Sequence, residues 1–404
     1  MTPMVPSRFY RSLRRIGLAG AALTALGALM AFAAPPHGCD LKAADAAHAG
    51  QGCAGVWMDH NLKLNDVLAV GTHNSYKTAI PPAVFDLIRK VEPDGGKGLD
   101  YGHPPLDAQL DEGARQLEID VYYDPKGGRF AHPVLPEQAG IAIEPWRRAA
   151  WAQPGYKVMH VPDEDVLSSC PTLIGCLQTI RQWSLAHPGH VPIMLMFNTK
   201  DDQSAIPGGT GALPYDEKAY DALDKEIRSV FPPEALITPD DVQGHYPTLR
   251  DAVLHDNWPT LGQARGKVIF AMDEGPEKVA IYRGNRPSLQ GRVFFINTDE
   301  TSPAAGYITL NDPIGDAARI KAAVAAGFLV RTRADEDTIQ SRTNDPTRRT
   351  AALASGAQFV STDYMHPDLR FSDYTVKLPD GATMVCNPVR AAAKCAGLPI
   401  ETKP

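Results

Sequence analysis

Two acidic residues, Glu118 and Asp120, stand two positions apart in the apolar run 117–123. In a β-strand both carboxylates point to one face, and the apolar residues between and beside them point to the other. Two buried carboxylates repel each other and are costly to desolvate unless a cation lies between them. A basic partner such as Arg115 is one candidate. The preferred interpretation is a hard divalent ion, Ca²⁺ before Mg²⁺, to which Asn74 would add a carbonyl oxygen.

Two histidines, His73 and His160, come at the ends of short apolar runs. His73 lies in GTHNSY, residues 71–76, whose Gly, Asn and Ser are also typical of a plain turn before a helix. Two histidines beside a metal suit phosphoryl transfer. One assists the nucleophile or the charge that develops at phosphorus, and the other protonates the leaving alkoxide. We therefore predict both as catalytic, with Asp165 available to orient His160.

Three cationic residues, Lys200, Arg331 and Arg333, are candidates for binding a phosphate group. Arg331 and Arg333 alternate onto one face of a predicted strand, so both guanidinium groups would point inward. A structural salt bridge to Asp335 or Asp363 is an equally good interpretation for at least one arginine.

The elements that must position these residues are short apolar runs alternating with helical patterns. Strands are expected at residues 67–70, 117–123, 157–161, 192–198, 267–273, 293–299, 328–335 and 359–364, and helices at 172–186, 215–231, 315–326 and 345–356. Strands alternating with helices imply parallel βαβ units, and eight of them suggest an α/β fold of the (β/α)₈ TIM-barrel type. No GxGxxG follows the first run, which argues against a Rossmann fold. The first and third strands would bring both histidines to the same mouth, where barrels carry their active sites.

Four segments together resemble the bacterial Ca²⁺-dependent phosphoinositide phospholipase C family. They are GTHNSY, PPLDAQLDEGARQLEIDVYYDPKGG, KVMHVPDEDVLSSCPTLIGCLQTIRQWSLAHPGHVPIML and GFLVRTRAD. The resemblance covers residues 67–202 well and the second half of the predicted barrel more loosely. It implies a PLC-like phosphodiesterase barrel that cleaves phosphatidylinositol-type lipids to diacylglycerol and a (cyclic) inositol phosphate.

The resemblance also implies residue roles. His73 corresponds to the first catalytic histidine and His160 to the second, which protonates the diacylglycerol oxygen. The implied calcium ligands are Asn74, Glu118 and Asp120. Relatives usually carry an acidic ligand near the end of the fourth strand, where this chain has Asn198. Either Asn198 ligates through its carbonyl oxygen, or Asp201 or Asp202 supplies the charge.

Other functions use the same type of barrel. Glycerophosphodiester phosphodiesterases and sphingomyelinase D-like enzymes also combine two histidines with a carboxylate-bound cation, and the former typically carry His-Arg-Gly in place of His-Asn-Ser-Tyr. An exported binding protein with impaired catalysis is a further alternative, which Asn198 supports. The Pro- and Gly-rich segment 77–105 is a candidate for transient contact with a membrane surface. A monomer is expected.

The chain of 404 residues carries a formal net charge of −7 and no basic stripe, so we expect no nucleic-acid partner. A basic stretch and the uncharged run 16–33 predict a secretory signal, with an uncleaved membrane anchor as the alternative. The expected organisation is a signal peptide at 1–33, an extension at 34–60, the catalytic barrel at 61–375 and a C-terminal extension at 376–404. Six cysteines in three close pairs favour disulfides in an exported protein, and zinc is the weaker alternative. The expected pairs are Cys39–Cys53, Cys170–Cys176 and Cys386–Cys395.

Overall fold

The computed structural model describes residues 38–92 and 95–403. The predicted signal peptide at residues 1–33 lies outside these ranges. No helix in the described part of the chain is both long enough and apolar enough to pass through a membrane.

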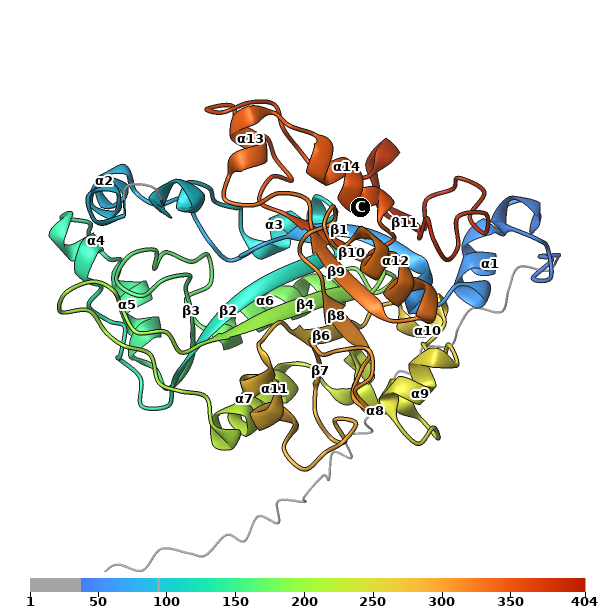
Figure 1. The fold of residues 1–404 in the computed structure, drawn as a ribbon, viewed down its shortest axis with the longest axis horizontal. Coiled ribbons are helices and arrows are strands. Elements are labelled where there is room, and N and C mark those ends of the chain that lie inside the picture. Colours follow the sequence, from blue (N-terminus) through green and yellow to red (C-terminus); the bar gives the residue numbers. More distant parts are fainter. Residues whose placement is uncertain (1–37, 93–94, 404) are drawn as a thin grey trace, which may run out of the picture. The chain divides into compact units, whose positions relative to one another are not determined.

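Parallel strands lie at the centre of the fold with helices around them (Figure 1), and their pairing forms a ring. Within the described residues eight strands take part, in the order β1, β2, β4, β6, β7, β8, β9, β10 and back to β1. A single parallel bridge between Asn297 and Tyr307 joins β7 to β8 and closes the ring. The predicted (β/α)₈ barrel is thus confirmed. The ring strands are β1 Val67–Thr72, β2 Gln116–Asp124, β4 Ile193–Lys200, β6 Val268–Met272, β7 Phe294–Ile296, β8 Tyr307–Thr309, β9 Leu329–Arg333 and β10 Phe359–Thr362.

One of the eight predicted strands is wrong. The run 157–161 is not a barrel strand, because β3 (Gly155–Val158) runs antiparallel to β2. Strand β3 pairs with the second half of β2, along the edge that faces β1. This part of the edge is free because β1 pairs with β2 only at Thr72 and Leu117. The strand missing from the prediction is β8. It has only three residues and is reached from β7 through turns instead of a helix, so neither its length nor its surroundings mark it in the sequence.

Helices cover the outside of the ring, and all four predicted helical stretches are confirmed. Thr172 begins α6 by accepting a hydrogen bond from the backbone N–H of Gly175, as an N-cap residue does. Leu177 and Ile180 of α6 belong to the same buried core as Ile119 on the outward face of β2. The longer helices are α1 Ala54–Asn61, α2 Pro82–Val91, α5 Pro145–Ala152, α6 Leu173–Ala186, α7 Glu217–Val230, α11 Pro276–Arg283, α12 Ala317–Ala326 and α14 Thr347–Ala354. The short helices are α3 Leu106–Asp111, α4 Val134–Gln138, α8 Pro239–Gln243, α9 Leu249–Leu254, α10 Leu261–Ala264, α13 Ile339–Thr343, η1 Ala46–His48, η2 Leu64–Asp66, η3 Gly95–Leu99, η4 Pro233–Ala235 and η5 Pro379–Gly381.

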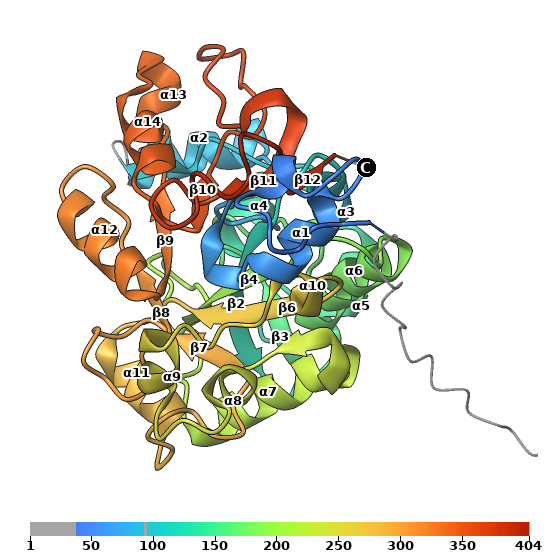
Figure 2. The ribbon, with the colours of Figure 1, turned by 90° about the vertical axis from the view of Figure 1, so that its right-hand side faces the viewer.

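The C-terminal segment packs onto the barrel. Strand β11 (Ala382–Cys386) pairs antiparallel with the first half of β1 and with β12 (Glu401–Thr402), while the short β5 (Leu236–Ile237) extends the sheet beside β6. Helix α1 and these C-terminal strands lie on the same side of the ring (Figure 2), where Cys395 contacts Met58. Segments 34–60 and 376–404 were predicted as extensions of a barrel at 61–375, and these boundaries stay predictions.

All three predicted disulfides are present, and the described chain has no free cysteine. They join Cys39 to Cys53, Cys170 to Cys176 and Cys386 to Cys395. Because every cysteine is paired, the alternative of a cysteine-bound zinc ion is excluded for the described residues.

Candidate active site

The register of the parallel strands brings the polar strand ends to one place inside the barrel. Residues paired in register share a face of the sheet. Asp120 pairs with Asn198 across β2 and β4, and Arg333 with Ser361 across β9 and β10. Following the register around the ring puts one inward-facing residue from each strand, or from the turn after it, at the carboxyl-terminal mouth. They are His73, Asp120, Asn198, Asp273, Asn297, Thr309, Arg333 and Asp363.

Residues 71–76, GTHNSY, form a turn that also contributes side chains to this mouth. The carbonyl of Glu118 accepts a hydrogen bond of 2.9 Å from the N–H of Ser75, and the Ser75 hydroxyl oxygen accepts one of 2.7 Å from the N–H of Glu118. Asn74 adopts the left-handed region at φ 48°, which Asn tolerates better than most residues. Gly71 is required here, because a Cβ atom would lie 2.1 Å from the carbonyl oxygen of Gln116 on β2. The turn is therefore fixed directly against the strand that carries the carboxylates.

His73 is held by a carboxylate from the last strand of the ring. Its Nδ1 lies 2.8 Å from Oδ1 of Asp363, and Arg333 places a guanidinium nitrogen 3.5 Å from the other oxygen of that carboxylate. Burial, reinforced by the positive charges of Arg333 and Arg331, lowers the pKa of His73 well below its usual value. Burial also raises the pKa of Asp363, whose backbone N–H donates to neighbouring Asp335. A hollow of about 440 Å³ opens beside this pair and includes Asp363 in its lining.

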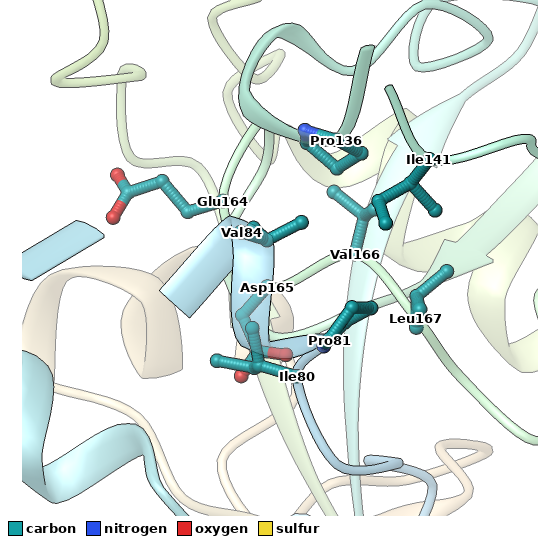
Figure 3. A pocket seen from close by; sticks show the side chains of 9 residues that line it. All are labelled: Ile80, Pro81, Val84, Pro136, Ile141, Glu164, Asp165, Val166 and Leu167. Atoms are coloured by element: carbon teal, nitrogen blue, oxygen red, sulfur yellow. The ribbon is translucent and has the colours of Figure 1, made fainter. Parts of the chain in front are cut away.

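His160 is held in the same way, from its own loop. Its Nδ1 lies 3.0 Å from Oδ2 of Asp165, and the fully buried Lys77 lies 3.1 Å from the same oxygen. Three backbone hydrogen bonds between Asp165 and residues 160–161 close this loop. Asp165 lies beside apolar side chains, including Ile80, Pro81 and Val166, while the side chain of Glu164 extends away from them (Figure 3). The prediction that His160 ends a parallel strand was wrong, since it lies in the loop after β3.

The carboxylate pair on β2 contacts cations from two other strands. Oε2 of Glu118 accepts a hydrogen bond of 2.6 Å from Arg331, and Oδ2 of Asp120 lies 3.3 Å from the ammonium group of Lys200. Arg115, the partner considered from the sequence, instead pairs with Glu401. Burial raises the pKa of Glu118 to about 7, although the charge of Arg331 opposes the shift.

The oxygen atoms around this pair fit a calcium ion. Both carboxylate oxygens of Asp120 are buried, and apart from the ion pair of Oδ2 with Lys200 neither has a hydrogen-bond partner. Asn198 donates its amide N–H to Oε1 of Glu118 over 3.0 Å, and its side chain shares the inward face with Asp120. Asn74 adds a second amide. Among the described residues no three His, Cys, Asp or Glu side chains are grouped as metal ligands, so the site would combine two carboxylates with two amide oxygens.

The alternative ligands proposed for the fourth strand are placed differently from Asn198. Asp201 forms an ion pair of 2.7 Å with Lys278, and Asp202 is exposed. Of these three residues, the structure places Asn198 in contact with Glu118.

The structure adds Asn311 and Tyr101, which the sequence did not single out, and joins them with Asp273 and Asn297 from the ends of the predicted strands 267–273 and 293–299. Oδ1 of Asn311 accepts a hydrogen bond of 2.5 Å from Arg331, which also lies 3.9 Å from Asp273. Asn297 donates to Asp273 over 3.3 Å. Asn311 follows β8, the strand absent from the prediction, so no predicted strand end pointed to it. Tyr101 was also missed, and its hydroxyl lies 3.2 Å from Nδ1 of His73.

The predicted phosphate-binding residues all lie at this mouth. In the structure each faces a carboxylate: Lys200 faces Asp120, Arg331 faces Glu118 and Arg333 faces Asp363. The salt bridge that the sequence allowed between an arginine and Asp363 is therefore present.

Most of the chain matches one described protein family. A family model described as phosphoinositide phospholipase C, Ca²⁺-dependent, matches residues 62–388. Among solved structures, the chain is similar to a calcium-dependent phosphoinositol-specific phospholipase C from the Gram-negative bacterium Pseudomonas sp, in its apo form with myoinositol. The identity is 18% and the TM-score 0.49, over 81% of this chain and 96% of the other. A Ca²⁺-dependent phosphatidylinositol-specific phospholipase C from Streptomyces antibioticus gives 17% identity and a TM-score of 0.49, over 81% and 99%. No curated protein matches the chain.

Proposed function

The chain belongs to the Ca²⁺-dependent phosphoinositide phospholipase C family, and from this premise we propose that it cleaves phosphatidylinositol-type lipids by two-histidine phosphoryl transfer. The products would be diacylglycerol and a cyclic inositol phosphate. His73 and His160 would carry the proton transfers, and Asn74, Glu118, Asp120 and Asn198 would hold the calcium ion.

One observation carries the mechanism: each histidine binds a buried carboxylate through Nδ1. The distances are 2.8 Å from His73 to Asp363 and 3.0 Å from His160 to Asp165. A carboxylate that accepts the Nδ1 proton fixes the tautomer and leaves Nε2 as the nitrogen for proton transfer. Nε2 of His73 lies 3.6 Å from Glu118, beside the proposed calcium site.

The steps follow from these positions. Nε2 of His73 accepts the proton of the ring hydroxyl next to the phosphate, and that oxygen attacks phosphorus. The bond from phosphorus to the glycerol oxygen breaks, and Nε2–H of His160 gives its proton to this oxygen. Calcium, when bound, supplies positive charge that favours ionisation of the attacking hydroxyl and offsets the charge on the phosphoryl oxygens. Lys200, Arg331 and Arg333 are proposed to meet the phosphate from the other strands.

The head group would lie on the side of Arg331. Asp273, Asn297 and Asn311 present carboxylate and amide groups there, which can bind the hydroxyl groups of a polyol ring.

Export is part of the proposal. Three disulfides are typical of an oxidising compartment, and the predicted signal at residues 1–33 would direct the chain there. Contact with the membrane surface through residues 77–105 remains a prediction. Two residues of this segment contact the site, because Lys77 pairs with Asp165 and the hydroxyl of Tyr101 lies beside His73.

The test is an assay of the chain without its first 33 residues on phosphatidylinositol vesicles, with calcium and with a chelator. Calcium-dependent release of diacylglycerol and phosphorylated inositol is expected. Parallel assays on sphingomyelin and on a glycerophosphodiester test the two alternatives. Release of choline from sphingomyelin would favour a sphingomyelinase D-like enzyme, and release of glycerol phosphate from the glycerophosphodiester would favour a glycerophosphodiester phosphodiesterase. Lipid binding without turnover would favour a binding protein.

A further inference from the structure

We propose that Tyr101 is a positioning residue that aims the carbonyl oxygen of Asn74 at the calcium ion. This inference rests on the proposed function, because it takes Asn74 as a calcium ligand. Neither the family match nor the sequence assigns a role to Tyr101.

An asparagine ligand must present its oxygen to a metal ion and turn its NH₂ group elsewhere. The Nδ2 atom of Asn74 donates a hydrogen bond of 2.8 Å to the hydroxyl oxygen of Tyr101. With its nitrogen held there, the amide directs Oδ1 away from Tyr101. Oδ1 of Asn74 accepts only a long hydrogen bond of 3.4 Å from the hydroxyl of Tyr76. A contact of this length is weak, so the oxygen keeps its capacity to bind a cation.

The same hydroxyl touches the catalytic histidine. It lies 3.2 Å from Nδ1 of His73, and the two rings stack at 6.1 Å between centroids with an interplanar angle of 23°. Tyr101 therefore contacts both the proposed base and the proposed metal ligand. Burial, together with the charge of Asp363, raises the pKa of Tyr101 well above its usual value, so the group stays a neutral hydroxyl near neutral pH.

The loop around Tyr101 is built to hold this position. Lys77 is fully buried, donates to the carbonyl of Tyr101 over 2.7 Å and lies 4.7 Å above the centre of its ring. Gly102 lies against the backbone of the segment that follows β1. A Cβ atom on residue 102 would lie 2.4 Å from the backbone nitrogen of Ala79. The N–H of His103 donates to the carbonyl of Lys77 over 2.8 Å. These contacts hold the ring in place independently of its hydroxyl.

Tyr101→Phe removes only the hydroxyl and keeps the ring. We expect calcium to bind about tenfold more weakly, because groups that orient a metal ligand commonly contribute a factor of this size. Calcium binding is measured by titration calorimetry on the protein without lipid, and melting temperature checks the fold. Tyr156→Phe is the matched control: Tyr156 is also buried, its hydroxyl donates to the carbonyl of Ala219 outside the site, and its loss should leave calcium binding unchanged.

The same Tyr101→Phe substitution in a chain that already carries Asn74→Asp separates loss of amide orientation from a general disturbance of the site. In Asn74→Asp the side chain ends in two equivalent oxygens, so its orientation no longer needs a partner for nitrogen. Tyr101→Phe should then cause no loss of calcium affinity or a much smaller one. An equal loss in both backgrounds, or none in the original chain, would overturn the role of Tyr101. Absence of calcium binding by the unsubstituted protein would overturn the calcium site of the proposed function as well, which makes the two failures distinguishable.

Discussion

At the scale of single residues, the two histidines have the same side chain but different surroundings. His73 is backed by Asp363, beside which Arg333 and Asp335 lie, whereas His160 is backed by Asp165 and Lys77. Both carboxylates bind Nδ1, so the roles of the two histidines must differ through what each Nε2 faces. Nε2 of His73 is on the side of Glu118 and therefore of the attacking hydroxyl in the proposed reaction.

The roles of the histidines can be separated by the leaving group. His160→Ala should slow cleavage of a diester with an alkoxide leaving group by roughly 10²–10⁴-fold, the usual contribution of acid catalysis. On a substrate that releases a nitrophenolate, which needs no proton, the variant should recover much of the lost rate. His73→Ala should not, because either substrate needs activation of the nucleophile. Steady-state kinetics on both substrates check this, and equal deficits throughout would contradict the assigned roles.

The calcium site can be tested at Asp120. Asp120→Asn halves the negative charge of the carboxylate pair, so calcium binding should weaken by about tenfold or more and turnover should fall sharply at low calcium. Calorimetry and calcium-dependent kinetics measure both effects. Asp202→Asn is the matched control, since Asp202 is exposed and should contribute little. If the Asp202 variant lost calcium and the Asp120 variant kept it, the ligand set would be wrong.

At the scale of elements, the loop that carries His160 depends on β3 and a disulfide. Strand β3 returns along the free edge of β2 and delivers the chain to His160, and the loop then closes through Asp165. Cys170 and Cys176 join the end of this loop to the first turn of α6. The loop that carries His160 is thus anchored at both ends by structure outside the parallel ring.

Removing this disulfide should loosen the loop as well as the fold. The Cys170→Ser, Cys176→Ser double variant should lose about 2 kcal/mol of unfolding free energy in the chain-entropy model for so short a loop. Turnover should fall because His160 is less well held, with calcium affinity nearly unchanged. Urea unfolding and kinetics measure these effects. The matched variant without Cys39 and Cys53, distant in sequence from the site, should lose stability but keep its turnover per folded molecule.

At the scale of the whole molecule, stability should depend on pH through histidines buried in neutral form. His190 lies between α6 and β4, donates from Nδ1 to the carbonyl of Val191 and accepts from the hydroxyl of Ser184. Burial lowers the pKa of His190 to about 4. The unfolded chain binds a proton at this residue below pH ~6.5, whereas the folded chain does so only near pH 4. Stability is therefore lost as the pH falls through this interval.

His190→Gln should remove this contribution. Between pH 7 and pH 4.5 the unfolding free energy of the variant should fall by about 2–3 kcal/mol less than that of the unsubstituted chain. Urea unfolding at the two pH values measures the difference. Parallel pH curves for the two proteins would contradict it. Because His190 precedes β4, at the end of the strand away from the mouth, activity at pH 7 serves only as a check of folding.

The sequence by itself determined the fold class, most of the barrel strands, the four long helical stretches and all three disulfides. It did so because these features are local: period-2 and period-3.6 patterns and close cysteine pairs can be read within a short window. It also placed Glu118 and Asp120 on one face, since two alternate residues on a strand share a face whatever lies around them. The roles of these carboxylates and of His73 and His160 stay predictions.

Only the tertiary structure decided what these residues touch. It assigned Arg331 rather than Arg115 to Glu118, turned the third predicted strand antiparallel, and supplied β8 with Asn311. It also brought Asp363 to His73 and Tyr101 to Asn74, pairs separated by 290 and 27 residues. Such contacts depend on the register and closure of the ring, which join segments far apart in the chain. No local pattern contains that information, because burial and partner choice are properties of the packed molecule.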